Sequence, residues 1–175
     1  MTTNNAEAVV FLRNEEMADM LFAATQEVFT SMLGCEVQRL SEPGTEQSAS
    51  FDGVLSLIGL VGAVIGNGSL VCSVETAYVL SSRLLMAEFS SVDAEVLDAV
   101  GEITNMIIGG FKTLLETRVG RVQMSIPTVI YGKNIATRNS GNVAAAARCA
   151  FPGGEITLKI RLAARPSARR DMQDL

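Results

Sequence analysis

Residues 98–110, DAVGEITNMIIGG, carry side chains that could do chemistry at a regular helical spacing. The set that we term the polar row recurs at intervals of three and four and consists of Asp98, Glu102, Asn105, Gly109 and Lys112. Because each residue turns an α-helix by about 100°, these positions share one side of it. Two carboxylates, an amide and a glycine would therefore face solvent together.

The amide of Asn105 narrows the chemistry that this row could perform. It offers two N–H donors and a carbonyl acceptor, but it is no base and a poor nucleophile. It can hold and orient a water molecule, which is useful when another molecule supplies the metal and the leaving group, as in the attack of water on an acyl phosphate. An ionised Glu102 would repel a phosphoryl group, so we expect it to pair with a cationic side chain beside that group.

The competing interpretation of the polar row is an ordinary solvated helix face, which is the more common case. Asn105, Gly109 and Gly110 weigh against it, because Asn and Gly each cost a fraction to about 1 kcal/mol in a helix interior relative to Ala. Gly109 would let the backbone of a partner come close. Close packing between helices would also explain two adjacent glycines.

The other side of this segment predicts the helix that positions the row. Apolar residues form one stripe at spacings of three and four, namely Val96, Val100, Ile103, Ile107, Phe111 and Leu114. Ser90 to Asp93 resembles a capping box with Asp in place of the usual Glu. We expect the helix to run to about Thr117 and to be broken by Gly120.

The rest of the chain predicts further helices and strands on both sides of this helix. A first helix is expected to be capped by Asn14, to run to about Met32 and to be ended by Gly34, and a polar loop is expected over residues 41–50. A short helix is expected over Glu75–Glu88. The predicted strands are Cys35–Leu40, Phe51–Leu60, Ser69–Val74, Val122–Ile126, Asn142–Phe151 and Glu155–Ala163. Gly66-Asn67-Gly68 is assigned to the hairpin rather than to a dinucleotide fingerprint, since no helix opens after it.

The element order repeats, which predicts one domain made of two related halves. When the long helices are superposed with Glu27 on Glu102, Gly34 falls on Gly109, and the apolar pairs are Leu21 with Val96, Val28 with Ile103 and Met32 with Ile107. The first helix has Ala23 and Thr30 where the second has Asp98 and Asn105, so a site would exist once. The expected boundaries are a tail at 1–13, a domain at 14–164 with halves at about 14–89 and 90–164, and a loose tail at 165–175.

Composition excludes several classes of protein. The 175 residues are 48% hydrophobic, which is enough to build a substantial core. A net charge of −5 argues against nucleic-acid binding. The absence of histidine excludes a Cys/His zinc site, and the three widely spaced cysteines are expected to be reduced thiols. Neither a signal peptide nor a membrane-spanning run is recognisable, so we expect a cytoplasmic protein with no membrane contact.

The run DAVGEITNMIIGG, followed by SIPTVIYGK, resembles the CheC/CheX/FliY family of chemotaxis phosphatases, and its CheX-like branch in particular. The family motif is an acidic or Ser residue, then Glu, then Asn on one helix, with a proline some two dozen residues later. Here these residues are Asp98, Glu102, Asn105 and Pro127. The resemblance covers most of residues 15–163, including the segment GLVGAVIGNGSLVCSV.

The resemblance implies an α+β fold of two pseudo-symmetric halves, with a mixed or antiparallel sheet and two long helices on one face. It also implies hydrolysis of the aspartyl phosphate on a CheY-type receiver domain. Asn105 would orient the attacking water, Glu102 would bind the receiver's cationic side chain, and Asp98, Glu102 and Gly109 would contact the partner. The Mg²⁺ would belong to the receiver, and a chain with one motif is expected to form a homodimer.

Two other hypotheses remain open at this point. The chain could be a CheX-like module that binds a receiver or a flagellar switch component without hydrolysing anything. It could also be a structural or oligomerisation domain with no site, in which case Glu102 and Asn105 should be buried. Ser125, which precedes Ile126-Pro127, is expected to have a structural role.

Overall fold

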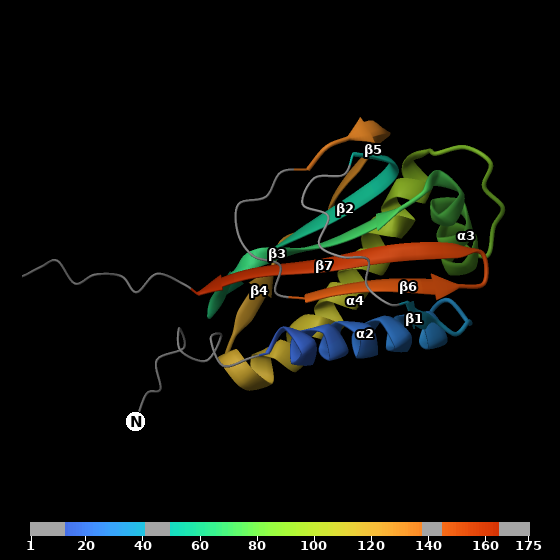
Figure 1. Ribbon diagram of the computed structural model, residues 1–175. Helices are drawn as coiled ribbons and strands as arrows, with labels where there is room; N and C mark the ends of the chain where they lie inside the picture. The colour runs from blue at the N-terminus through green and yellow to red at the C-terminus, as the bar shows by residue number, and fades with distance from the viewer. Residues whose placement is uncertain (1–12, 41–49, 138–144, 165–175) are drawn as a thin grey trace, which may run out of the picture.

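The computed structural model describes residues 13–40, 50–137 and 145–164 (Figure 1). The two predicted tails, apart from Arg13, and the predicted loop, apart from Ser50, lie outside the described residues. The elements in chain order are α2 (Asn14–Ser31), β1 (Gln38–Leu40), β2 (Phe51–Gly62), β3 (Val64–Cys72), α3 (Val74–Leu85), α4 (Ala94–Val119), β4 (Val122–Met124), β5 (Thr128–Ile135), β6 (Ala145–Phe151) and β7 (Gly154–Ala164).

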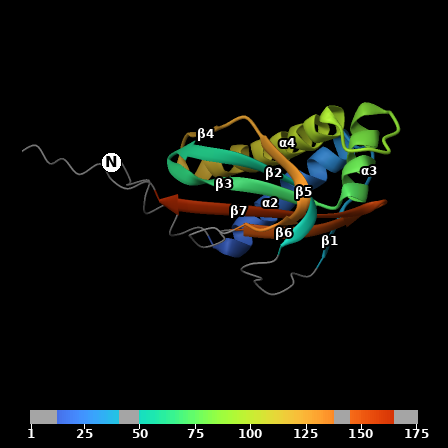
Figure 2. The same cartoon turned by 90° about the horizontal axis from the view of Figure 1, so that it is seen from above.

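In the described part of the chain, the strands form one seven-stranded sheet in the order β1-β6-β7-β3-β2-β4, with β5 also paired to β2. Each of these pairings is antiparallel. The helices gather on one face of the sheet, as Figures 1 and 2 show from two directions. The prediction of an α+β fold with an antiparallel sheet and long helices on one face is confirmed, and the shorter α3 lies on that face as well.

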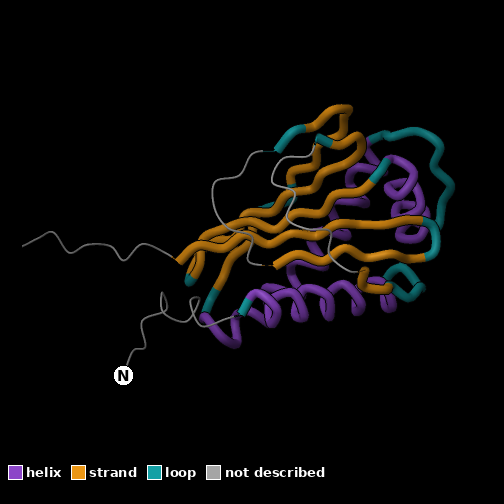
Figure 3. The backbone as a smooth tube through the Cα atoms, viewed as in Figure 1, coloured by secondary structure: helices purple, strands orange, loops and turns teal. Residues whose placement is uncertain are grey.

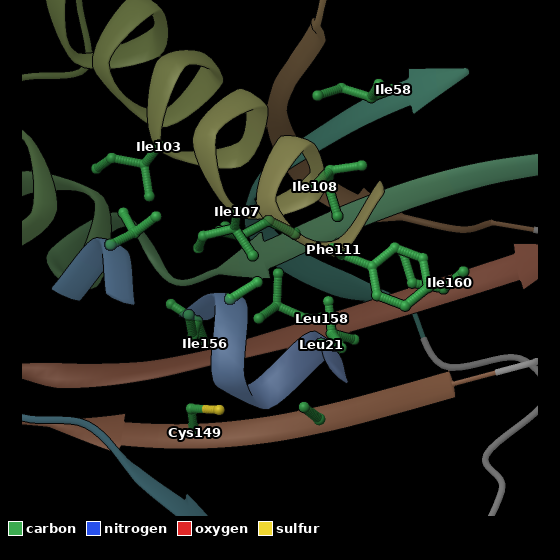
Figure 4. Packing of buried hydrophobic residues seen from close by; sticks show 14 of the residues in the cluster. Leu21, Ile58, Ile103, Ile107, Ile108, Phe111, Cys149, Ile156, Leu158 and Ile160 are labelled. Carbon is green, nitrogen blue, oxygen red and sulfur yellow. The ribbon is translucent and has the colours of Figure 1, made fainter. Parts of the chain in front are cut away.

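The core fills the space between α4, α2 and the sheet. Alternate residues of β7, namely Ile156, Leu158 and Ile160, are almost completely buried, while the residues between them are more accessible. This period of two presents one apolar face to the helices. Figure 4 shows these side chains meeting Ile107 and Phe111 of α4.

The first hairpin differs from the prediction. We expected its second strand to begin at Ser69, but β3 begins at Val64, so Gly66 and Gly68 lie within the strand. A Cβ at Gly68 would stand 2.7 Å from Cδ1 of Ile108, so this glycine lets α4 lie close to the sheet. The turn falls after Gly62, whose φ of +144° is a conformation that side chains rarely adopt. Gly68 therefore serves helix–sheet packing, and Gly62 serves the turn.

One strand was not predicted at all. β5 follows Pro127 and pairs with the first half of β2, from Thr128 opposite Leu57 to Ile135 opposite Phe51. Two predicted strands are shorter, since β1 begins at Gln38 rather than Cys35 and β4 ends at Met124 rather than Ile126. β6 ends at Phe151 as predicted, and the first three residues of that prediction lie outside the described residues.

The helix ends are partly as predicted. Arg13 precedes the first turn of α2 and makes no side-chain capping bond, so the prediction of Asn14 as the cap is wrong. Gly34, with φ of +62°, follows the last turn, where the amide of Cys35 donates to the carbonyl of Phe29. This left-handed ending confirms Gly34 as the residue that stops α2. The shorter α3 begins after Ser73, whose hydroxyl accepts from the amide of Thr76.

The described strands form one layer (Figure 3), and both predicted halves contribute strands to it. The short strand β1 comes from residues 14–89 but pairs with β6, and β4 comes from residues 90–164 but pairs with β2. Each half therefore completes the strand set of the other, which agrees with a single domain. The duplication itself stays a prediction. None of the described helices has the length and apolarity that crossing a bilayer requires.

Candidate active site

The polar row lies on α4, which is held firmly along its opposite side. Its first turn is capped by the Asp93 carboxylate, which accepts from the amide of Val96 at 3.0 Å. This is a capping role for Asp93 itself, so the predicted box that begins at Ser90 is wrong. The predicted apolar stripe is buried except at its last member, because Leu114 is 39% exposed and Leu115 is buried in its place. Because one side of α4 is packed in the core, the backbone that carries the exposed side chains of the polar row is held in place.

The C-terminal end of α4 is tied to the strand that follows it. Glu116 accepts from the amide of Val122 at 2.7 Å and pairs with Lys112 at 3.2 Å. The Val122 amide, and then Lys112, hold the pKa of the Glu116 carboxyl below its usual range. Lys112 is thus engaged within its own helix, and the chemical part of the polar row is reduced to Asp98, Glu102, Asn105 and Gly109.

The three polar side chains of the row differ in exposure. Asp98 and Glu102 are exposed, and Asn105 is half-buried. Within the described part of the chain, none of the three forms a hydrogen bond or an ion pair. Their hydrogen-bonding capacity is therefore directed at solvent or at a binding partner. The burial expected for a purely structural domain is not seen at Glu102.

The two glycines of the helix have different surroundings. A Cβ at Gly110 would lie 3.1 Å from the Cβ of Ala24, so this glycine lets α2 and α4 approach closely. A Cβ at Gly109 would meet only the end of Met124, at 3.9 Å, which is an ordinary contact. Packing within the chain thus explains Gly110 and leaves Gly109 without a structural reason.

The connection from β4 to β5 runs alongside α4, so the candidate site is bordered by this connection as well as by the helix itself. Met124, at its start, lies beside Gly109, and Pro127, at its end, lies 3.6 Å from a Cβ placed on Gly101. Asn105 is four residues from each of these glycines, so the middle of the connection passes beside the amide. By the same helical geometry Asn105 is nearer to this border than Glu102, which agrees with its greater burial.

Ser125 fixes this connection to the sheet. Its hydroxyl accepts from the amide of Gly59 at 2.9 Å, and its own amide donates to the Gly59 carbonyl at 2.9 Å. The hydroxyl also donates to the carbonyl of Ile126. These bonds give Ser125 the structural role that the sequence predicted, and they leave Ile126 with 85% of its surface exposed.

The sequence analysis named Pro127 but did not single out Gly101, which lies against it, or Ile126, which is exposed next to it. The sequence carried one signal for Ile126, because a residue that precedes a proline is biased toward extended backbone. Nothing in the sequence indicated that the side chain of Ile126 would be exposed. In the described residues, no group of three or more Cys, Asp or Glu side chains is placed to hold a metal ion.

Comparisons with known proteins identify the family and the fold of this chain. The family model described as "Chemotaxis phosphatase CheX" matches residues 54–148, which include α4, β5 and the whole polar row. The CheY-P phosphatase CheX of Thermotoga maritima is 27% identical over 127 residues, covering 71% of this chain and 81% of that protein.

Two solved structures show the same fold. The CheX crystal structure from Vibrio vulnificus matches with a TM-score of 0.72 and 26% identity, covering 86% of this chain and 99% of that one. The CheX–CheY–BeF3–Mg²⁺ complex from Borrelia burgdorferi matches with a TM-score of 0.68 and 27% identity, covering 83% and 96%. Since the family model spans more than half of the 175 residues, this chain belongs to the CheX family of chemotaxis phosphatases.

Proposed function

We propose that this protein hydrolyses the aspartyl phosphate of a CheY-type receiver domain. The observation that carries the proposal is the pair Glu102 and Asn105, whose side chains have no hydrogen-bond or ion-pair partner among the described residues and lie on the accessible side of a well-packed helix. The relatives support it, because one is a CheY-P phosphatase and another was solved in complex with CheY. The reaction is transfer of a phosphoryl group from an aspartate to water.

Asn105 is proposed to place the attacking water. Its carbonyl oxygen accepts a hydrogen bond from the water, and its N–H₂ group donates to a phosphoryl oxygen or to the water. Holding water in line with the breaking P–O bond removes the cost of orienting it, which is the main contribution that a neutral amide can make. The bond between water oxygen and phosphorus forms, the bond to the aspartate oxygen breaks, and the products are a free aspartate and inorganic phosphate.

Glu102 is proposed to hold the receiver rather than to react. It is exposed one helical turn before Asn105, so a cation that it binds would lie beside the phosphoryl group that Asn105 addresses. Asp98 adds a second carboxylate one helical turn before Glu102. Gly109 extends the row in the other direction and offers bare backbone, which fits close approach by a partner.

The Mg²⁺ is proposed to arrive with the receiver. The Borrelia burgdorferi complex contains Mg²⁺ together with CheX and CheY. Asp98 and Glu102 are the carboxylates of the row, and neither belongs to a group among the described residues that could enclose a metal. The metal would neutralise charge on the phosphoryl oxygens while Asn105 handles the water.

The test follows phosphoryl decay on a panel of receivers from the same organism. We expect the wild type to accelerate decay on at least one receiver. Asn105→Ala should lower the maximal acceleration by about 10²–10³-fold, the usual effect of removing one preorganised hydrogen-bonding group. Thr30→Ala is the matched control, because Thr30 occupies the aligned, exposed position on α2. Equal rates for the wild type and Asn105→Ala would refute the catalytic role.

The same experiment separates catalysis from mere binding. A non-catalytic module would bind the receiver in the presence of beryllofluoride and Mg²⁺ but would leave the phosphoryl lifetime unchanged. A homodimer and a cytoplasmic location also belong to the proposal. Light scattering of the purified protein and fractionation of cells would test them.

A further inference from the structure

We propose that Ile126 is an apolar docking residue that seats the receiver beside Asn105. The inference rests on the proposed function and adds a contact to it, since the polar row supplies only charged and hydrogen-bonding groups. The occupant is the surface of the same receiver domain that carries the phosphoryl group.

The position of Ile126 follows from the packing of its neighbours. Pro127 lies against α4 at Gly101, and Met124 reaches α4 at Gly109. Ile126 lies between them on a short connection that runs past the helical turn of Asn105. A partner surface that covers this turn of α4 and the connection beside it would therefore contact both the amide and this side chain.

The backbone around Ile126 is held on both sides. Before it, Ser125 exchanges two hydrogen bonds with Gly59 of β2 and donates a third to the carbonyl of Ile126 itself. After it, Pro127 has a ring-restricted φ and packs on the helix. An apolar side chain presented by a fixed backbone loses little conformational freedom on binding, which favours its use as an anchor.

Exposure together with position sets Ile126 apart from the other accessible apolar residues, since Met86 is more exposed, at 94%, but follows the last turn of α3 rather than lying on the β4–β5 connection. Single exposed hydrophobic residues are common and need no explanation. Ile126, however, is 85% exposed and borders the candidate site, whereas Ile65 is 41% exposed within β3. Ile65 alternates with the fully buried Val64, so it points to the face of the sheet away from the helices.

The test measures decay of phosphorylated receiver as a function of receiver concentration, together with binding of the receiver activated by beryllofluoride and Mg²⁺. For Ile126→Ala we expect about a tenfold rise in the half-saturating concentration and in Kd, with the maximal rate within about twofold of wild type. Ile126→Leu should restore binding. Ile65→Ala is the control and should match the wild type, and circular dichroism should show that all variants are folded.

The outcomes distinguish this inference from the proposed function. If the wild type is active and Ile126→Ala equals it in both constants, Ile126 is not a docking residue, and the proposed function stands. A lower maximal rate with unchanged half-saturation would also overturn the inference, because it would place Ile126 in the chemical step. If the wild type neither binds nor dephosphorylates any receiver, both proposals fail together.

Discussion

Helices α2 and α4 lie against the same sheet and each leads into a short strand, yet only α4 carries a candidate site. Both bury an apolar stripe, as Leu21 and Val96 show at aligned positions with 0% exposure. Both also expose a glutamate at the aligned position, Glu27 and Glu102. The accessible residues on either side of this glutamate differ, since α2 has Ala23 and Thr30 where α4 has Asp98 and the half-buried Asn105. Packing thus constrains the buried sides alike and leaves the exposed sides free to differ.

The helices also differ in length, and the difference matters for the site. The left-handed Gly34 ends α2, and the preceding Met32 is 49% exposed. In α4 the aligned Gly109 is inside the helix, and the aligned Ile107 is fully buried. The longer helix provides the surface along which the β4–β5 connection packs. Both helices therefore expose a glutamate, but of the two only α4 also carries an amide next to the β4–β5 connection.

Charge reversal of the two aligned glutamates should give the largest contrast in binding. Glu102→Arg is expected to weaken binding of an activated receiver at least about a hundredfold, because like charges brought together cost several kcal/mol. Glu27→Arg should leave the affinity unchanged. Titration calorimetry with the receiver, beryllofluoride and Mg²⁺ would measure both. Equal losses for the two variants would mean that general electrostatic attraction, and not the α4 site, holds the partner.

A smaller contrast is expected in the stability of the protein when either of the two adjacent glycines is replaced. Gly110→Val should lower the free energy of unfolding by about 1–3 kcal/mol, because its side chain would collide with Ala24 of α2. Gly109→Val, which meets only the flexible end of Met124, should change it by less than about 1 kcal/mol. Urea denaturation monitored by circular dichroism provides the values. Identical losses would show that contact between α2 and α4 is not what requires Gly110.

The smallest expected effect is a difference in thiol reactivity between Cys35, which follows α2, and the two cysteines of the sheet, Cys72 and Cys149. Burial raises the pKa of the Cys72 thiol to about 12 and that of Cys149 to about 11, the latter against a lowering influence of Arg39. The reactive thiolate of both is therefore scarce below pH 10, whereas Cys35 is half-buried at the chain's exit from α2. At pH 8 a thiol reagent should label one cysteine per folded chain and three after denaturation. Rapid labelling of a second thiol in the folded state would contradict the burial.

Several features of α4 could be predicted because they depend on local sequence. The buried stripe through Val96, Ile103 and Phe111 follows from the helical period, and Gly120 ends the helix because its φ of +92° suits glycine. Leu114 was misplaced because the sequence offers two adjacent leucines and the period alone does not choose between them. The structure buries Leu115, four residues after Phe111.

The strand β5 could not be assigned from local signals. Its residues Thr128 to Tyr131 favour a strand, but the segment is only half-buried and shows no clean alternation. Its pairing with β2 depends on residues more than seventy positions earlier. The hairpin was mispredicted for a related reason, since Gly68 looks like a turn residue until Ile108 is seen to pack on it.

The sequence alone determined which groups could act: a carboxylate and an amide at helical spacing, with no histidine to serve as a base. These follow from residue types and from the fixed rotation of a helix, both of which are local. The tertiary structure decided which of them are accessible, which glycine is needed for packing, and that Ile126 stands exposed on the connection that packs along α4. Those properties depend on chain segments that meet only after folding, so no window of sequence contains them.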